Sequence, residues 1–346
     1  MKKILITGGA GFFGTLLKKR LLEKENYMCV SIDLEKDTYK HENLISIQGD
    51  ITDKKILEEI FENHKFDAIF HCAAILAHDK RNIKKLWNSN VLGTEIISEF
   101  AIKYNVKKIV FISSNCLWGK NFENLVTEEE IPDPIEIYGK SKLEAEKILI
   151  SKKDKINSII FRSPTIIDEG RLGLLSMLFE FIDENRKIPM VGDGNNRYQF
   201  IYAQDFIEAF LASLDYNKTE IFNIGSDNVK TFNDVYKYVI DKSNSKSKLL
   251  HFPKIFMIMA MKICYLLRIS PLGPYQYKMI SSSFIFDTTK IKKELNFKPT
   301  LTNEEMLLKA YNFFHTNRKE ISNRKDVSAH NQNAKMGIIK VLKWFL

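Results

Sequence analysis

The chain has 346 residues, of which 45% are hydrophobic and 27% are charged, and this composition is typical of a globular protein with one large core or two lobes. Its formal net charge is +9, but residues 315–346 carry seven Lys and Arg against Glu320 and Asp326, so this end supplies +5 and the other residues only +4. A charge this small and scattered excludes a nucleic-acid-binding groove.

The cysteines lie far apart and show no metal-ligand spacing, so we expect no metal site and reduced thiols in a cytoplasmic protein; they are Cys29, Cys72, Cys116 and Cys264. The first strand-like residues, 3–7, leave no room ahead of them for a secretory signal. The longest apolar segment, Ile255 to Leu267, is interrupted by Lys262 and is shorter than the roughly 20 residues of a membrane span.

Strand-like and helical patterns alternate along the first half of the chain. Strands are predicted at 3–7, 28–32, 44–47, 67–71, 108–113 and 157–162, and helices at about 12–24, 54–64, 84–104, 139–152 and 174–185. This repetition predicts an α/β fold of the Rossmann type, a doubly wound parallel sheet with helices on both faces and its ligand at the carboxyl ends of the strands. After about residue 165, Pro and Gly residues punctuate shorter elements, which predicts a smaller C-terminal substrate lobe.

Three glycines at three-residue spacing, Gly8, Gly11 and Gly14, follow the first predicted strand and open the first predicted helix. Glycine permits a positive φ at such a turn, lets backbone N–H groups approach a pyrophosphate and lets the helix pack on the strand, while the phosphate lies at the helix N-terminus. Asp33 ends the next apolar run, Met28 to Ile32. In this context the glycines predict a dinucleotide site, and a tight turn without a ligand is the alternative.

Two further groups lie where a catalytic site is expected. Ser113 and Ser114 follow the apolar run 109–112, and Tyr138 and Lys142 lie four residues apart at the start of a predicted helix. This spacing places both side chains on one helix face, so the ammonium group can lower the pKa of the phenol and make it a base near neutral pH. Ser114 can polarise the reacting oxygen. A solvated helix face is the alternative for the Tyr–Lys pair alone.

With these residues in order, the chain resembles the extended short-chain dehydrogenase/reductase family, in particular its NAD-dependent sugar epimerase/dehydratase branch, over about residues 1–314. The resemblance rests on Thr7 to Gly14, Gly49 to Ile51, His71 to Ala74, Asn90 to Thr94, Ser113-Ser114 and Tyr138 to Lys142. Later matches are Gly192 to Gly194, Asp205, Phe222 to Gly225, and Asp287 through Lys290 to Pro299. The resemblance implies NAD as the cofactor and a homodimer.

The resemblance also implies a role for each residue of the predicted catalytic site. Tyr138 is the implied acid/base, and Lys142 holds the nicotinamide ribose. Ser114 binds the reacting hydroxyl, and Asn90 supports the active site. Asp33 is implied to bind the adenosine ribose, where a carboxylate accepts hydrogen bonds from two hydroxyls and repels a 2′-phosphate. NAD is therefore favoured over NADP.

Further contacts are implied on both sides of the site. Besides Asp33, Asn90, Tyr138 and Lys142, the implied cofactor contacts are Gly8, Gly11, Phe12, Phe13, Gly14, Leu34, Asp50, Ile51, Cys72, Ala73, Ala74 and Pro164. For Asp50, the N-cap of the helix that follows is the alternative. The expected substrate contacts are Ser114, Tyr138, Thr165, Arg197, Tyr198, Tyr277 and Lys278.

We expect three parts along the chain. Residues 1–165 form the NAD-binding Rossmann domain, whose sheet can regain elements from 195–225, and residues 166–314 form the substrate-binding lobe. Residues 315–346 form a basic linker and an amphipathic C-terminal tail.

Two departures from the family pattern bear on the substrate. Sugar-nucleotide 4,6-dehydratases carry an acidic pair directly after the active-site Thr or Ser, where this chain has Asn115 and Cys116, so a dehydratase is disfavoured because a second general acid is missing. The two arginines usual in nucleotide-sugar members are replaced by Tyr198 and Tyr277. Their neighbours, Arg197 and Lys278, can substitute only if the local register shifts.

The sequence therefore predicts an NAD-dependent nucleotide-sugar epimerase, of the UDP-hexose 4-epimerase type, that works through a transient keto-sugar. Two alternatives stay open. One is an NAD(P)-dependent dehydrogenase or reductase of a non-nucleotide or lipid-linked substrate, and the other is a catalytically inactive NAD-binding protein.

Two apolar segments have more than one interpretation. The segment His251 to Arg268 is either a helix packed on the core of the substrate lobe or an apolar surface for a lipid-bearing substrate or a membrane. In residues 336–346, Ile338, Leu342 and Phe345 share one helical side, while Lys340 and Lys343 lie together on another. This tail either contacts the inner membrane face peripherally or packs against the protein or a second subunit.

Overall fold

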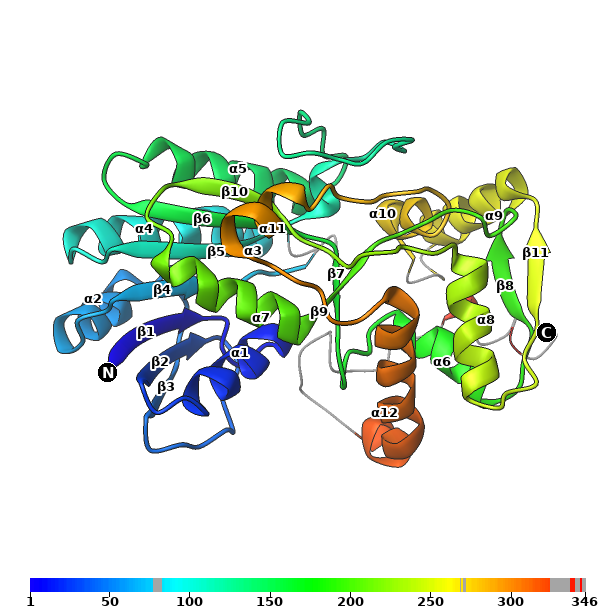
Figure 1. The fold of residues 1–346 in the computed structure, drawn as a ribbon, viewed down its shortest axis with the longest axis horizontal. Helices are drawn as coiled ribbons and strands as arrows, with labels where there is room; N and C mark the ends of the chain where they lie inside the picture. Colours follow the sequence, from blue (N-terminus) through cyan, green and yellow to red (C-terminus); the bar gives the residue numbers. More distant parts are fainter. Residues whose placement is uncertain (77–82, 268, 270–271, 324–336, 340–342, 344–346) are drawn as a thin grey trace.

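The structure is a computed structural model that describes residues 1–76, 83–267, 269, 272–323, 337–339 and 343. Figure 1 shows two regions side by side: a sheet covered by helices, which contains the N-terminus, and a smaller region of helices and short strands built mainly from the second half of the chain. None of the helices in the described residues is long and apolar enough to cross a membrane.

Seven parallel strands form the sheet of the larger region, in the order β10-β6-β5-β4-β1-β2-β3. They are β1 (Lys2–Thr7), β2 (Tyr27–Asp33), β3 (Leu44–Gln48), β4 (Ala68–His71), β5 (Lys108–Ser114), β6 (Asn157–Ser163) and β10 (Glu220–Asn223). The chain starts near the centre and winds outward in both directions, so the strand order reverses between β1 and β4. Such a reversal is where doubly wound sheets bind ligands. The predicted doubly wound parallel sheet is confirmed.

Helices cover both faces of this sheet. On one face, α1 (Phe12–Leu22) and α7 (Ala203–Ala212) pack through a cluster of aromatic rings that includes Phe13, Phe161 and Phe206. On the other face, α2 (Lys54–Asn63), α4 (Gly93–Lys103) and α5 (Ile137–Ser151) pack on a second apolar cluster. Along β1, Ile4 and Ile6 point to the first cluster and Leu5 to the second. Because both faces are buried, the strands are continuous apolar runs rather than alternating ones.

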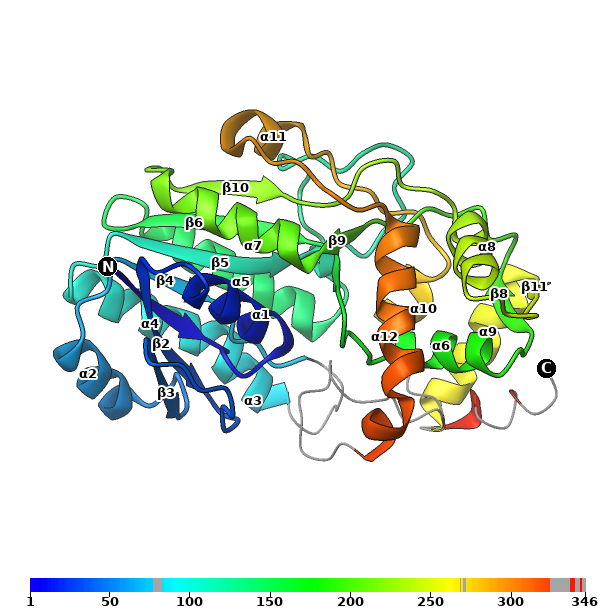
Figure 2. The same cartoon turned by 60° about the horizontal axis from the view of Figure 1, so that its bottom comes forward.

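The smaller region has its own core, enclosed mainly by α6 (Leu175–Asp183), α8 (Phe232–Lys242) and α12 (Asn303–Asn323). Two short parallel pairs belong to it: β7 (Thr165–Ile167) with β9 (Phe200–Tyr202), and β8 (Ile188–Val191) with β11 (Leu249–Phe252). Figure 2 shows α12 standing between the sheet and the other helices of this region. The remaining helices are α9 (Lys254–Leu266), α10 (Pro274–Met279) and α11 (Thr289–Leu295), the last of which packs beside β10.

The six predicted strands agree with the structure to within one residue at each end. One predicted helix is wrong in detail. The continuous helix expected at 84–104 is divided into α3 (Ile83–Trp87), a π-helical turn (Asn88–Leu92) and α4. A π turn inserts one extra residue into a helix and is frequent at functional sites, and this one contains Asn90.

Candidate functional site

A cavity of about 640 Å³ lies at the carboxyl ends of the sheet strands and extends to the smaller region. Each of the strands β1 to β6 contributes its last residue or the loop that follows it. The opposite wall comes from the segment before α6 and from α8 and α10, through residues that include Arg171, Leu175, Phe232, Tyr236, Gln276 and Met279. The site therefore lies where the topology of a doubly wound sheet places it.

The glycine loop after β1 has the geometry that a pyrophosphate requires. Gly8 has a φ of 74°, and a Cβ built on it would lie 2.6 Å from the backbone nitrogen of Ala73. A Cβ on Gly14 would collide with the carbonyl oxygen of Gly8. Gly11 is the N-cap of α1 and provides no side-chain hydrogen bond, so the N–H groups of the first turn remain available to an anion.

A buried lysine holds this loop from behind, and the sequence analysis did not select it. The Nζ of Lys18 donates to the carbonyl oxygen of Gly9 at 2.9 Å and forms an ion pair with Asp37. Burial lowers the pKa of Lys18, while Asp37 opposes that change. The lysine thus fixes the loop without lining the cavity.

The carboxylates at the ends of β2 and β3 are positioned by backbone groups. Asp33 accepts from the N–H groups of Ala10 at 2.9 Å and Glu35 at 3.0 Å, which leaves it lining the cavity beside Leu34. Asp50 also lines the cavity, and its Oδ1 accepts from the N–H and hydroxyl of Thr52, both at 2.8 Å. Asp53, not Asp50, caps α2, so the alternative of Asp50 as the N-cap is wrong.

A buried histidine connects the strands beneath the cavity. The ring nitrogens of His71 lie 2.6 Å from Thr7 Oγ1 and 2.9 Å from Thr94 Oγ1. Burial, together with the nearby Lys142 cation, lowers the pKa of His71 to about 3, so the ring is neutral. It holds β4 in place ahead of Cys72, Ala73 and Ala74, which line the cavity.

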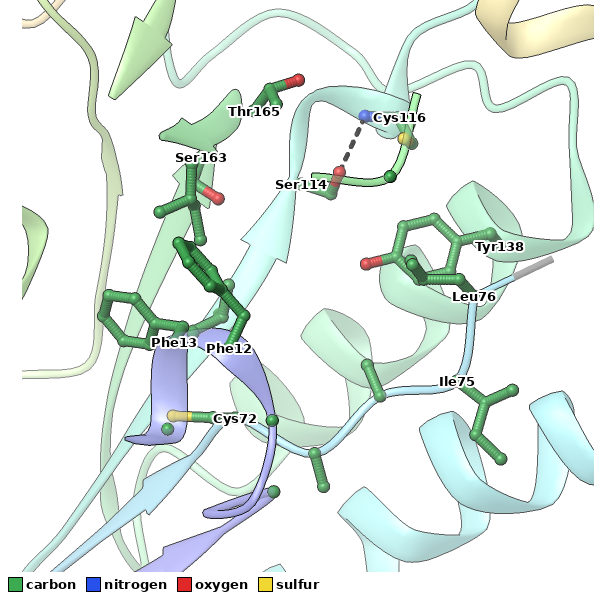
Figure 3. A pocket seen from close by; sticks show the side chains of 18 of the residues that line it. Phe12, Phe13, Cys72, Ile75, Leu76, Ser114, Cys116, Tyr138, Ser163 and Thr165 are labelled. Atoms are coloured by element: carbon green, nitrogen blue, oxygen red, sulfur yellow. Dashed lines mark hydrogen bonds between the residues drawn. The ribbon is translucent and has the colours of Figure 1, made fainter. Parts of the chain in front are cut away.

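The predicted catalytic side chains meet in one part of the cavity. Figure 3 shows the hydroxyl of Tyr138 reaching into the cavity, while that of Ser114, which also lines the cavity, points toward the N–H of Cys116. The Oγ of Ser114 accepts from the N–H of Cys116 at 3.1 Å, so the hydroxyl keeps its proton for a second partner. The Nζ of Lys142 donates to the carbonyl oxygen of Ile112 at 2.9 Å and lies 5.9 Å from the centre of the Tyr138 ring.

The electrostatics of this group differ from the sequence-based expectation. Burial raises the pKa of Tyr138, and Arg171 is the cation that opposes the rise. Burial also lowers the pKa of Lys142 to about 8 and that of Arg171 to about 10. The net shift of the Tyr138 pKa is therefore upward, opposite to the lowering that the sequence predicted, because burial outweighs the cation that opposes it. To act as a base, Tyr138 must therefore react as the phenolate, which the buried cations nearby stabilise.

Asn90 lies outside the cavity lining and acts through other residues. Its Oδ1 accepts from the N–H of Ile75 at 2.8 Å, and its Nδ2 donates to the Ile75 carbonyl oxygen at 3.1 Å and to Ser141 Oγ at 3.0 Å. Ser141 in turn donates to the carbonyl oxygen of Tyr138 at 2.7 Å. Asn90 therefore joins the loop after β4 to the start of α5, which carries Tyr138.

The structure brings together most of the residues predicted to contact the cofactor. All the glycines, carboxylates and apolar residues predicted for that role line the cavity: Gly8, Gly11, Phe12, Phe13, Gly14, Asp33, Leu34, Asp50, Ile51, Cys72, Ala73, Ala74 and Pro164. Tyr138, Lys142 and Ser114 also line it, as does Thr165 on the substrate side. The residues present thus fit a dinucleotide.

Three predicted substrate residues do not line the cavity. Tyr198 is buried, because its parallel bridge to Phe284 turns the ring into the core of the smaller region, where its hydroxyl accepts from Asn115 Nδ2 at 2.5 Å. Arg197, the neighbour on the same strand-like segment, is exposed instead. Tyr277 lies on α10 between Gln276 and Met279, which line the cavity, but Tyr277 itself does not line it. The side chain of Lys278 lies outside the described residues.

Arg171 and Glu136 are among the polar residues of the cavity that the sequence analysis did not select. Arg171 is the only arginine among the lining residues, and its guanidinium lies 5.6 Å from the Phe12 ring. Glu136 lines the cavity two residues before Tyr138. The sequence feature that could have drawn attention to Arg171 is the pair of glycines around it, Gly170 and Gly173. Both adopt a positive φ shortly after β7.

A model of the NAD-dependent epimerase/dehydratase family matches residues 4–225. The chain belongs to this family. Its cofactor is NAD, and the residues that line the cavity at the ends of β1 to β4 are those that would hold it.

Individual relatives within the family differ in what they do. The uncharacterized protein y4nG of Sinorhizobium fredii is 31% identical over 348 residues, which covers 100% of this chain and 87% of that protein. Human dTDP-D-glucose 4,6-dehydratase is 29% identical over 72% of this chain and 77% of its own length. The crystal structure of UDP-glucose 4-epimerase with UDP-glucose from Thermotoga maritima is 25% identical, with a TM-score of 0.75 over 91% of this chain and 99% of that one.

Proposed function

We propose that the protein is an NAD-dependent nucleotide-sugar epimerase that inverts C4 of a UDP-hexose through a transient keto-sugar. The observation that carries the proposal is that Tyr138 and Ser114 line the same cavity as the glycine loop. The similarity to UDP-glucose 4-epimerase of Thermotoga maritima supports the same substrate class.

The chain's own residues supply the proton chemistry. Bound NAD supplies a reversible acceptor for the hydride that leaves the sugar carbon. Ser114 donates a hydrogen bond to the reacting oxygen. The phenolate form of Tyr138 takes the hydroxyl proton as the keto form develops, and the resulting phenol returns it when the alcohol is restored. Lys142 and Arg171 stabilise the phenolate during this step, because both cations are buried near Tyr138. Asn90 keeps the backbone of Tyr138 in place through Ser141.

The residues after Ser114 favour epimerisation over dehydration. Asn115 is buried and donates to the hydroxyl of Tyr198, so its amide faces the core of the smaller region. Cys116 lines the cavity with a thiol, which is a poor general acid for expelling a hydroxyl. Glu136, two residues before Tyr138, is a carboxylate that lines the cavity. Replacing it tests directly whether the enzyme catalyses dehydration.

Arg171 takes the place of the two arginines that the sequence lacks. A guanidinium binds a diphosphate through paired N–H groups, and a site that excludes water makes such bonds stronger. Arg171 lies in the cavity on the side of the smaller region, whereas Arg197 is exposed and Tyr198 is buried. We therefore assign the diphosphate of the substrate to Arg171.

A second candidate is a dehydrogenase or reductase that acts on a lipid-linked substrate. It is favoured by the tyrosines at both expected arginine positions and by the apolar residues Met279 and Ile280, which line the cavity from the end of α10. The two candidates share Tyr138 but differ in whether the cofactor is consumed.

The experiment that tests the proposal is incubation of the enzyme and NAD with UDP-glucose, followed by NMR of the sugar. We expect UDP-galactose to form without net production of NADH. Stoichiometric NADH would instead establish a dehydrogenase, and a deoxy keto-sugar would establish a dehydratase. Glu136→Gln serves as the matched variant, since an epimerase retains its turnover there and a dehydratase that uses this carboxylate does not. The homodimer stays a prediction, which analytical ultracentrifugation tests.

A further inference from the structure

Helix α9 presents apolar side chains to solvent rather than to the core. Seven of the sixteen large hydrophobic side chains that are exposed among the described residues lie between Ile255 and Ile269. Ile255 is 79% exposed, Leu266 76% and Phe256 66%, whereas Met261 is the helix's one buried residue. The interpretation of this segment as a helix packed on the core is therefore wrong for most of its length.

The exposed side chains form one continuous stripe. At 100° per residue, Ile255, Phe256, Met259, Ile263, Leu266 and Leu267 fall within an arc of about 120°, and Met261 lies opposite. Such a stripe on a helix of 13 residues is too short to span a bilayer but is suited to lie in its surface plane. Figure 2 shows α9 on the outside of the smaller region.

The chain segment that carries the stripe is basic. Between Asp241 and Asp287 the chain has six lysines and one arginine and no carboxylate. Five of these lysines are described as exposed: Lys242, Lys246, Lys248, Lys254 and Lys262. Carboxylates from other segments also approach this stretch, among them Asp193 near His251 and Glu136 near Gly273.

In the residues that the structure describes, the C-terminal tail contacts the rest of the protein. The N–H of Ile338 donates to the carbonyl oxygen of Ile269 at 3.0 Å, and Ile339 packs against the core of the smaller region. Lys343 donates to Glu180 at 2.8 Å and to Glu184 at 3.0 Å. Its charge is therefore paired inside the molecule, while the lysines around α9 remain exposed. The rest of the tail pattern predicted at 336–346, including Leu342 and Phe345, lies outside the described residues.

We infer that α9 docks on an anionic lipid surface, with its apolar stripe in the headgroup layer and its lysines against lipid phosphates. Charge complementarity selects this occupant, because a two-fold related second copy would place the same lysines against one another. Docking has a consequence for the cavity: α9 contacts α10, and Gln276, Met279 and Ile280 at and after α10 line the cavity. The lipid surface would therefore lie close to the substrate side of the site.

The test is co-sedimentation of the full chain with vesicles of phosphatidylcholine that contain about one third phosphatidylglycerol. We expect the wild-type protein to pellet with these vesicles, less so at high salt and far less with phosphatidylcholine alone. Ile255→Glu should reduce the partition coefficient about tenfold or more, since a side chain that inserts is replaced by a charge. The matched control is Ile131→Glu, because Ile131 is 80% exposed on another part of the surface. It should bind as the wild type does.

Three outcomes would overturn the inference. They are no pelleting of the wild type with anionic vesicles, equal binding by Ile255→Glu and the wild type, and loss of binding only when residues 336–346 are deleted. A dimer in sedimentation that Ile255→Glu dissociates, without vesicle binding, would also overturn it in favour of a second copy. NAD titration of each variant verifies that the exposed substitutions leave the fold intact.

Discussion

The two regions of the molecule differ in how directly the sequence determines their part of the site. In the sheet region, every residue predicted for the cofactor apart from Asn90 lines the cavity. Most of them follow a strand whose carboxyl end the topology brings to one edge, and Tyr138 and Lys142 lie on α5. In the smaller region, Arg197, Tyr198 and Tyr277 miss the cavity. Their placement depends on bridges between distant segments, such as Tyr198 with Phe284.

This difference assigns separate tasks to the two regions. The sheet region contributes the residues that would hold the cofactor and the proposed catalytic groups, and the smaller region contributes the opposite wall of the cavity. A variant in the first should therefore abolish chemistry, while one in the second should alter the choice of substrate. The predictions below test that separation.

The largest effect is expected from Tyr138→Phe. Removing the hydroxyl that transfers the proton should lower kcat by about 10²–10⁴-fold, and the loss of one oxygen from the cavity wall should leave the fold intact. Steady-state kinetics and thermal unfolding of the variant provide the measurement.

Tyr198→Phe is the matched control for this substitution. It removes a buried tyrosine hydroxyl from the smaller region that accepts from Asn115 but does not line the cavity. We expect reduced stability and nearly unchanged kcat. Equal losses of turnover in the two variants would refute the assignment of proton transfer to Tyr138.

The junction between the regions should be sensitive to loss of a buried ion pair. Arg162, at the end of β6, donates to Glu146 on α5 at 2.8 Å, and its guanidinium lies 5.2 Å from the ring of Trp118, which belongs to the core of the smaller region. Both charged side chains are at most 5% exposed. Arg162→Ala should therefore lower the free energy of unfolding by about 3–5 kcal/mol, because it leaves a buried carboxylate unpaired.

Urea denaturation measures this loss, and an exposed pair on the same helix is the control. Lys147 and Glu144 form an ion pair at 3.3 Å with side chains 62% and 42% exposed. Lys147→Ala should change the free energy of unfolding by less than about 1 kcal/mol. Similar values for the two variants would show that the Arg162 pair does not stabilise the junction.

The sheet and the cofactor site could be predicted because their signals are local. The glycine spacing, the apolar runs and Asp33 at a strand end each occupy a few neighbouring residues, and the order of elements then fixes where they meet. Asn90 was implied by the family resemblance, but its π-helical turn was not predicted, since an apolar helical pattern does not reveal one inserted residue.

The residues that were missed depend on distant contacts. Lys18 looks like a surface lysine of α1 and is buried only because Asp37 and the Gly9 carbonyl face it. Arg171 reaches the cavity because β7 pairs with β9, a contact between segments more than thirty residues apart. Helix α9 shows the converse: its apolar composition left burial and an exposed apolar surface both open, and only the surrounding structure shows which side is covered.

A smaller effect, restricted to the substrate, is expected from Arg171→Ala. If this guanidinium binds the substrate diphosphate, its loss should raise the KM for a UDP-hexose by about 10–100-fold, the range for hydrogen bonds to a charged group. The Kd for NAD should stay unchanged. Arg197→Ala is the control, because its side chain is exposed outside the cavity. A weakened NAD affinity with an unchanged KM would reassign Arg171 to the cofactor.

The smallest effect is a pH dependence set by Lys142, whose pKa burial lowers to about 8 from its ordinary value of 10.5. The ammonium form is present below that pKa and is lost as the pH rises through it. Because the cation stabilises the phenolate of Tyr138, kcat/KM should be level below about pH 7.5 and fall by about tenfold at pH 9.

The lowered pKa of Lys142 affects stability in the opposite direction from activity. A loss of activity caused by Lys142 can therefore be distinguished from alkaline unfolding. Between the folded pKa of about 8 and the unfolded pKa of 10.5, the unfolded chain binds more protons than the folded one, so the contribution of Lys142 to the free energy of unfolding increases with pH. Activity should therefore fall over a range in which this residue makes the fold more stable. Lys142→Met removes the titrating group, and its pH profiles, subtracted from those of the wild type, isolate both effects. A wild-type kcat/KM that stays level up to pH 9 would exclude a required Lys142 cation.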